Sequence, residues 1–263
     1  MGQVVAGTFV QIRLPLGDID LELYDKDKPE TVRNFLRYIQ SGAFTNNQFI
    51  HRWEPGFVIQ GGGYWVADRR LSSVEILPID TFGTITNEYS VGRKFSNVYG
   101  TIAMARAGGL PNSADSQWFL NLGDNAFLDS VDGGFTVFGH VVGNTNVLER
   151  FNKVDSANGV YRMDIGGALN HLPVLSLDPT YDDLVYADIT TLRVSVEKLA
   201  ASTRQVSWMS VKNATNVVEF TSTFPPTWNT LIKTNGNGSR LQVQDSSTSS
   251  ATRFYRVRVE HRP

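Results

Sequence analysis

The amino-acid sequence predicts a mainly β protein: a closed antiparallel barrel with two helices plugging its ends, followed by a small all-β domain. Short segments in which apolar and polar residues alternate recur between residues 8 and 198, as expected of half-buried strands. Only two stretches have the spacing of an amphipathic helix, and they do not alternate with the strands. This order argues against a doubly wound parallel sheet, in which helices and strands alternate.

Composition limits the classes of partner. The chain has 263 residues, a net charge of −2 and 41% hydrophobic residues, which suits one large domain or a large and a small one. Its basic residues are scattered, so we expect neither nucleic acid nor an anionic membrane surface as a partner. The absence of cysteine excludes disulfides and thiolate chemistry. No apolar run approaches the ~20 residues of a membrane helix, so we expect no membrane insertion.

The N-terminal residues MGQVVAGTFVQIRL lack the basic region and uninterrupted apolar core of a signal peptide, and they are typical of a strand. The localisation is therefore left open. A periplasmic or secreted protein is favoured if a signal peptide was removed, and a cytoplasmic protein otherwise.

The first elements are an expected hairpin and helix. Residues 8–14 and 19–24 alternate in hydrophobicity and predict an antiparallel pair. Pro29 suits the first position of a helix and Gly42 suits its C-terminal stop. The apolar stripe of this helix is formed by Val32, Phe35, Leu36 and Ile39.

The rest of the barrel region has less regular patterning. Residues 64–97 have weak periodicity, and we expect mostly loop there. Further strands are predicted near residues 102–104, 118–122, 135–142, 160–165 and 184–198. A second helix is predicted over residues 146–153, with Asn146 and Glu149 as a variant capping box.

The candidate site centres on residues 49–63, FIHRWEPGFVIQGGG, where Arg52 stands among apolar residues. Because Pro55-Gly56 forces a turn, we expect Arg52 and Gln60 on adjacent extended segments facing one shallow apolar pocket. A planar donor that stays charged, beside such a pocket, suits a ligand with an apolar ring and an adjacent carbonyl. From this stretch alone, a surface arginine beside core strands is an equally good interpretation.

Further motifs later in the sequence strengthen the prediction of a pocket beside Arg52. With GTIAMARAG, PNSADSQWFLNLGDNAFLD and GGFTVFGHVVGNTNVLERF following in order, the chain resembles the cyclophilins, and its MAR and DNAFLD segments are similar to the bacterial branch. The resemblance covers roughly residues 7–196. It implies an eight-stranded barrel capped by two helices, and a peptidyl-prolyl cis/trans isomerase that acts on proline-containing polypeptides, assists folding and needs no cofactor or metal.

The resemblance also implies roles for individual residues. Arg52 matches the catalytic arginine of the family, and we assign Gln60 to the catalytic pair with it. Phe127 stands where drug-sensitive members have a tryptophan that helps to bind cyclosporin, which predicts weak sensitivity. The implied substrate-binding residues are Phe57, Val58, Ala105, Arg106, Gln117, Phe119, Phe127, Leu128 and Phe135.

Other kinds of site are less well supported. A hydrolase built from Ser116, His51 and Asp115 would lack a nucleophile elbow, and Asp115 and Ser116 would point opposite ways on a strand. The four histidines lack metal-ligand spacing, and His51 is better explained as a buried structural residue. The run Gly61–Gly63 lacks the Lys-Ser/Thr of a phosphate loop, and it suits a tight turn and a close backbone approach.

The tail looks like a separate module. We expect an isomerase domain over residues 1–199, a linker at 200–203, and a β-sandwich-like accessory domain over 204–263. Its strands are predicted at residues 206–211, 217–223, 228–233, 241–244 and 254–260. A core this small is marginal alone, so we expect the domain to dock on the barrel, another subunit or a surface partner, with a cell-surface or glycan docking module as the functional alternative.

Two other functions remain open from the sequence. One is a proline-peptide binding or docking module with little catalysis, and the other is a scaffold whose groove is covered by residues 64–97 or by the tail. Retention of Arg52 together with the pocket residues favours the enzyme, because pure binding would tolerate loss of the arginine first.

Overall fold

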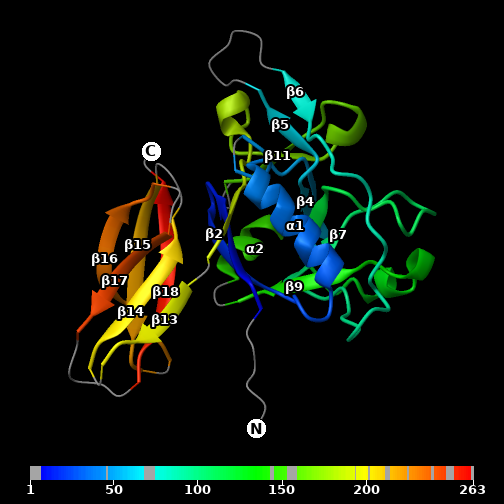
Figure 1. Ribbon diagram of the computed structural model, residues 1–263. Helices are drawn as coiled ribbons and strands as arrows, with labels where there is room; N and C mark the ends of the chain where they lie inside the picture. The colour runs from blue at the N-terminus through cyan, green and yellow to red at the C-terminus, as the bar shows by residue number, and fades with distance from the viewer. Residues whose placement is uncertain are drawn as a thin grey trace. The chain divides into compact units, whose positions relative to one another are not determined.

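The computed structural model describes residues 7–45, 47–67, 75–142, 145–152, 159–192, 194–200, 202–210, 214–223, 225–237, 240–246 and 252–261. The chain forms two compact units, Met1–Thr190 and Thr191–Pro263 (Figure 1). This division falls before the boundary expected at residues 199–204, because β13 (Val194–Lys198) pairs with β14 (Arg204–Met209) of the second unit.

The first unit is built on an eight-stranded sheet with the order β12-β1-β2-β9-β7-β8-β4-β3. Every pairing with a given register is antiparallel, as expected. The predicted N-terminal hairpin is present, with Ile12 opposite Ile19. The strands are β1 (Phe9–Leu14), β2 (Gly17–Leu23), β3 (Arg52–Glu54), β4 (Val58–Gly61), β7 (Thr101–Met104), β8 (Trp118–Asn121), β9 (Val137–Val141) and β12 (Asp188–Thr191).

The two ends of this sheet are joined by backbone hydrogen bonds just before its edge strands β3 and β12. The N–H of Ile50 donates to the carbonyl of Val185 at 2.9 Å, and the N–H of Ala187 donates to the carbonyl of Gln48 at 2.9 Å. A bridge pairs Phe49 with Tyr186 between them. The backbone groups next to both edges are therefore satisfied by each other.

Helix α1 (Pro29–Ser41) confirms the predicted first helix, with Gly42 as its left-handed C-cap at φ 86°. All four residues of its predicted apolar stripe are buried. None of the helices among the described residues is long and apolar enough to cross a membrane.

Helix α2 (Asn146–Phe151) is also present, but the predicted capping box is wrong. The N-cap is Thr145, so Asn146 is already the first helical residue, and no side-chain bond caps the helix. The carboxylate of Glu149 instead accepts a hydrogen bond from the hydroxyl of Tyr99. Lys153, at the end of the predicted helix, lies outside the described residues.

Residues 64–97 are mostly irregular, as expected, but they contain a short hairpin of β5 (Tyr64–Val66) and β6 (Ile76–Pro78). A second two-stranded pair, β10 (Tyr161–Met163) with β11 (Leu172–Val174), confirms the strand predicted near residue 160. Short 3-10 helices cover Ala126–Asp129, Val131–Gly133, Gly167–Leu169 and Tyr181–Asp183.

The two faces of β8 pack into different hydrophobic clusters of the first unit. Trp118 is fully buried in the main cluster with residues such as Ile12, Trp53 and Leu120. Its neighbour Phe119 belongs to a different cluster with Val58 and Leu128. Trp118 and Phe119 therefore face opposite ways, as alternation along a strand requires.

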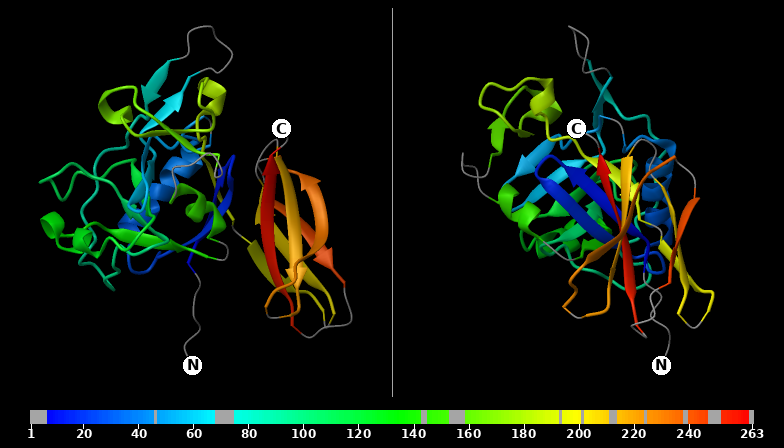
Figure 2. Two further views of the ribbon diagram at one scale, coloured as in Figure 1. Left: turned by 180° about the vertical axis from the view of Figure 1, so that it is seen from behind. Right: turned by 90° about the vertical axis from the view of Figure 1, so that its left-hand side faces the viewer.

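The second unit contains two three-stranded sheets, shown from yellow to red in Figure 2. One is β13-β14-β17, with β17 at Arg240–Asp245, and the other is β16-β15-β18, with the strands Asn229–Asn235, Ala214–Thr221 and Phe254–His261. Both sheets contribute to one cluster of Val206, Trp208, Val218 and Val257. The five strands predicted in the tail are all present with small shifts of their ends, although Val211 lies outside the described residues.

Candidate functional site

The predicted site residues surround a hollow of about 170 Å³ on the first unit. Nine of the eleven residues expected at the site line it, drawn from β3, β4, β8, the 3-10 helix Ala126–Asp129 and the segments next to β4, β7 and β9. The lining residues are Arg52, Phe57, Val58, Gln60, Ala105, Arg106, Phe119, Leu128 and Phe135.

The β3–β4 turn sets the two polar residues side by side. Gly56 has φ 70°, and the N–H of Phe57 donates to the carbonyl of Glu54 at 2.9 Å, which closes the turn that Pro55 begins. In the resulting register Arg52 lies directly opposite Gln60. The Arg52 Nη1 donates to Gln60 Oε1 at 3.5 Å. The expected arrangement of these two residues on adjacent strands is therefore confirmed.

The floor of the hollow is apolar. Val58, Phe119 and Leu128 are buried in one cluster, and the ring of Phe135 meets the ring of Phe119 edge to face at 5.9 Å. Phe57 packs partly buried against this cluster, and the guanidinium carbon of Arg52 lies 5.8 Å from its ring centre. A cation thus stands at the rim of a pocket that would exclude water from an apolar ring.

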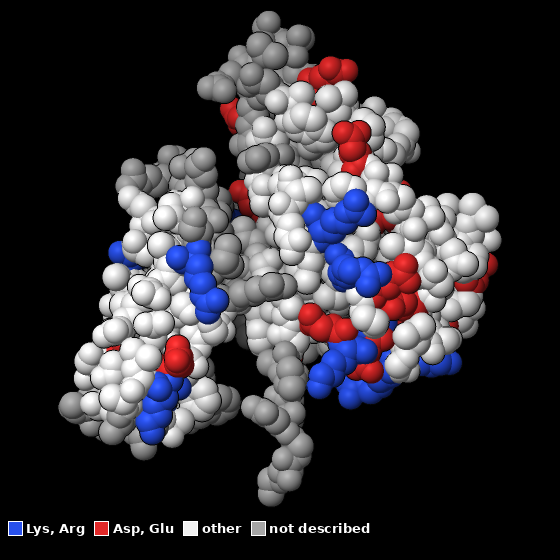
Figure 3. Space-filling model, viewed as in Figure 1, with Lys and Arg blue, Asp and Glu red and all other residues white. Residues whose placement is uncertain are grey.

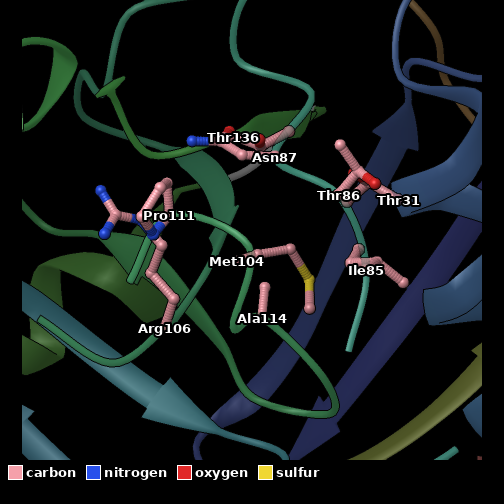
Figure 4. Close-up of a pocket in the computed structure, with 9 residues that line it drawn as sticks. All are labelled: Thr31, Ile85, Thr86, Asn87, Met104, Arg106, Pro111, Ala114 and Thr136. Atoms are coloured by element: carbon pink, nitrogen blue, oxygen red, sulfur yellow. Dashed lines mark hydrogen bonds between the residues drawn. The ribbon is translucent and has the colours of Figure 1, made fainter. Parts of the chain in front are cut away.

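Arg106 forms one wall of the hollow. Its side chain is only 2% exposed, its Nη2 donates to the carbonyl of Val131 at 2.9 Å, and its guanidinium carbon lies 4.1 Å from the ring centre of Phe135. The same residue borders a second, much smaller hollow (Figure 4). There Arg106 and Pro111 lie across from Thr31 and Ile85. Arg106 therefore acts as a packed partition between the two hollows.

Two expected site residues do not line the hollow. Gln117 lies behind Gln60 and accepts a hydrogen bond from its Nε2 at 2.8 Å. Phe127 is 57% exposed and stacks on Phe57 with ring centres 5.9 Å apart. Gln117 therefore contacts a lining residue from outside the hollow, and Phe127 is an exposed neighbour of Phe57.

His51 is a buried residue of the strand region that carries Arg52. Its imidazole is 2% exposed and lies edge to face with Tyr64. Burial lowers the pKa of His51 to about 4, and the charge of Arg52 acts in the same direction. The burial expected for His51 is confirmed, and a histidine with this pKa is neutral near pH 7.

The glycine run holds this region together through close contacts. Gly62 has φ 77°, and a Cβ on it would lie 2.4 Å from the carbonyl oxygen of Ser116. A Cβ on Gly61 would lie 2.6 Å from the ring of Trp118. The expected close backbone approach is confirmed.

An acidic residue that was not among the predicted site residues lies beside Arg52. Glu54 lies two positions along β3, and its Oε1 is 3.5 Å from Arg52 Nη2. The spacing alone could have indicated this contact, because residues two apart on a strand share a face.

The surface of the first unit carries charges of both signs. On the face drawn in Figure 3, basic and acidic side chains of the first unit lie next to one another. Within the part of the chain that the structure describes, no group of three or more histidines or acidic residues could hold a metal ion.

Comparison with known proteins gives consistent matches. A family model described as "Cyclophilin type peptidyl-prolyl cis-trans isomerase/CLD" matches residues 9–165. The chain is 36% identical over 155 residues to a peptidyl-prolyl cis-trans isomerase of Acinetobacter baylyi, covering 58% of this chain and 76% of that protein. It is 38% identical over 154 residues to peptidyl-prolyl cis-trans isomerase B of Escherichia coli, covering 57% and 87%.

A solved structure, a cyclophilin type peptidyl-prolyl cis-trans isomerase of Cryptosporidium parvum, matches with 20% identity and a TM-score of 0.48. The match covers 70% of this chain and 96% of that one.

Proposed function

This chain belongs to the cyclophilin-type peptidyl-prolyl cis-trans isomerases, and from that premise we propose that Arg52 is the group that accelerates rotation about the X–Pro bond. Isomerisation is the activity of the family. The observation that carries the proposal is the position of Arg52 at the rim of the apolar hollow, directly opposite Gln60.

The reaction needs a stabilised twist and no bond cleavage. The amide C–N bond has partial double-bond character, and rotation about it is opposed by ~18–20 kcal/mol. In the twisted state the proline nitrogen becomes pyramidal and its lone pair localises. A guanidinium N–H directed at that nitrogen binds the twisted state better than the planar one, which lowers the barrier.

The other residues hold the substrate while one end rotates. The proline ring occupies the hollow against Val58, Phe119 and Leu128, where its burial is favoured by the hydrophobic effect. Gln60 and the chain at Ala105 and Arg106 hold the carbonyl side. The bond from Gln60 to Gln117 fixes the amide of Gln60, so this side of the substrate is gripped rather than free to turn.

We extend the proposal to the fold. The sheet of the first unit closes into a barrel through the hydrogen bonds between residues 48–50 and 185–187. Residues 204–263, together with β13, form a β-sandwich-like accessory domain, which is supported by the cluster shared between its two sheets. The partner of this domain is the barrel, another subunit or a surface ligand, and proline-containing polypeptides are the substrates.

NMR exchange spectroscopy on a short Ala-Pro-Phe peptide tests the proposed role of Arg52. Cross-peaks between the cis and trans forms should grow with the wild-type protein and should be largely lost with a folded Arg52→Ala variant. Peptide shifts that show binding, without faster exchange in the wild type, would instead support a binding module and refute the proposal.

A further inference from the structure

We propose that Glu54 is a positioning residue for Arg52, and that Arg162 and His171 hold Glu54 in place. The inference rests on the proposed role of Arg52 in catalysis. His171 lies beyond residues 9–165, the part of the chain that matches the family model, so this support comes from a segment outside that match.

The direct contacts of Arg52 are long. Its Nη1 reaches Gln60 Oε1 at 3.5 Å, its guanidinium carbon lies 5.8 Å from the ring centre of Phe57, and its side chain is 38% exposed. A hydrogen bond of that length is weak, and a long side chain at the surface samples several rotamers. The Glu54 carboxylate, with Oε1 3.5 Å from Arg52 Nη2, adds a charged contact on the opposite guanidinium nitrogen.

Glu54 is itself restrained from two sides. Its Oε2 accepts from Arg162 Nη2 at 3.1 Å, and its Oε1 is in contact with His171 Nδ1. The backbone adds to this attachment, because the N–H of Trp53 donates to the carbonyl of His171 at 2.7 Å. The side chain of Glu54 is only 22% exposed, and these contacts fix its position independently of Arg52.

This network changes the energy of the Arg52–Glu54 pair. An isolated exposed ion pair contributes little, ~0–1 kcal/mol, because two long side chains must be ordered to form it. Here the ordering of Glu54 is shared with its contacts to Arg162 and His171, so only Arg52 loses freedom when the pair forms. The guanidinium then presents its remaining N–H groups toward Gln60 and the hollow.

The Glu54 carboxylate also has an electrostatic effect that opposes catalysis. A carboxylate beside the guanidinium reduces the positive potential felt by the proline nitrogen. Arg52 keeps its full charge with or without Glu54, whereas its orientation depends on a partner. Since catalysis by an oriented donor is sensitive to small displacements, we expect orientation to outweigh the loss of potential. Removing the charge of Glu54 would also leave Arg52 and Arg162 as neighbouring cations without a shared counter-charge.

The test is Glu54→Gln, which keeps the size of the side chain and removes its charge. We expect kcat/KM for a proline peptide to fall about fivefold, as the loss of about 1 kcal/mol predicts. Peptide affinity should change less than about twofold, because the apolar hollow is untouched. The Nε–Hε signal of Arg52, assigned with Arg52→Lys, should shift and broaden as the side chain gains freedom.

Three further variants act as controls. In an Arg52→Lys background, Glu54→Gln should have no further effect, because the carboxylate works through the guanidinium. Arg162→Gln should produce a smaller loss in the same direction, since it removes one support of Glu54. Glu75→Gln, which removes an exposed carboxylate that does not line the hollow, should leave the rate unchanged.

A Glu54→Gln variant as fast as the wild type or faster, or one with an unaltered Arg52 Nε–Hε signal, would overturn the positioning role. The outcome for Arg52→Lys separates this from failure of the proposed function. If Arg52→Lys slows exchange while Glu54→Gln does not, Arg52 keeps its role and only Glu54 loses it. If neither variant slows exchange, the proposed role of Arg52 itself is wrong.

Discussion

Acidification should destabilise the first unit through His51, and His51→Gln should remove that part of the dependence. The pKa of His51 is lowered to about 4 by burial, whereas an exposed histidine titrates near 6.5. The unfolded chain therefore takes up a proton at this position before the folded chain does. Stability rises with pH between about 4 and 6.5, and the contribution is lost as pH falls through this window.

The size of the effect follows from the two pKa values. From pH 7 to pH 5 the free energy of unfolding should fall by about 2 kcal/mol through His51 alone, and by about 3 kcal/mol once the pH is below both values. Other groups titrate in the same range. The quantity to compare is therefore the difference between wild type and His51→Gln at each pH.

Urea unfolding of both proteins, from pH 4 to pH 8, supplies this difference. The indole N–H signal of Trp53, which donates to the carbonyl of Phe151 inside the first unit, reports on that unit without interference from the second. The wild-type curve should be steeper than that of His51→Gln below about pH 6.5. Parallel curves over the whole range would show that His51 titrates normally, and would refute the explanation by burial.

Three other substitutions probe the hollow and its supports. Gly62→Ala should lower the free energy of unfolding by at least ~2 kcal/mol in thermal or urea unfolding, because its positive φ and the nearby Ser116 carbonyl leave no room for a Cβ; wild-type stability would contradict this. Leu128→Ala should cost about 3 kcal/mol and weaken peptide binding in an NMR titration, whereas unchanged affinity would exclude the hollow as the proline site. Gln60→Ala should reduce kcat/KM about five- to tenfold in an exchange assay through loss of its hydrogen bonds to Arg52 and Gln117, and a full rate would remove Gln60 from the site.

Local patterning predicted the elements that are long enough to show a period. The alternation in residues 8–24 predicted the antiparallel hairpin, in which the structure pairs Ile12 with Ile19, and the first helix ends at Gly42 as expected. The motif around Arg52 predicted both the turn and the facing Gln60, because Pro55-Gly56 fixes the geometry of a tight connection.

Very short strands, and contacts between residues far apart in the sequence, could not be predicted from local patterns. Strands β5 and β6 have three residues each, too few to display a period, and β5 is anchored by a bridge from Trp65 to Gln48. The capping box was wrong because helix α2 begins one residue earlier than the pattern indicated, with Thr145 rather than Asn146 as its N-cap. The contact of Glu54 with His171 joins residues 117 positions apart, so only the folded chain brings them together.

In the proposed mechanism the oriented guanidinium of Arg52, rather than its charge alone, accelerates rotation. NMR exchange spectroscopy with Arg52→Lys tests this mechanism, since lysine keeps the charge but lacks the planar fork. Arg33→Lys, on the exposed face of helix α1, is the matched control. We predict that Arg52→Lys binds the Ala-Pro-Phe peptide but exchanges it at least ~10-fold more slowly, while Arg33→Lys behaves as the wild type. An Arg52→Lys variant with the wild-type exchange rate would contradict this mechanism.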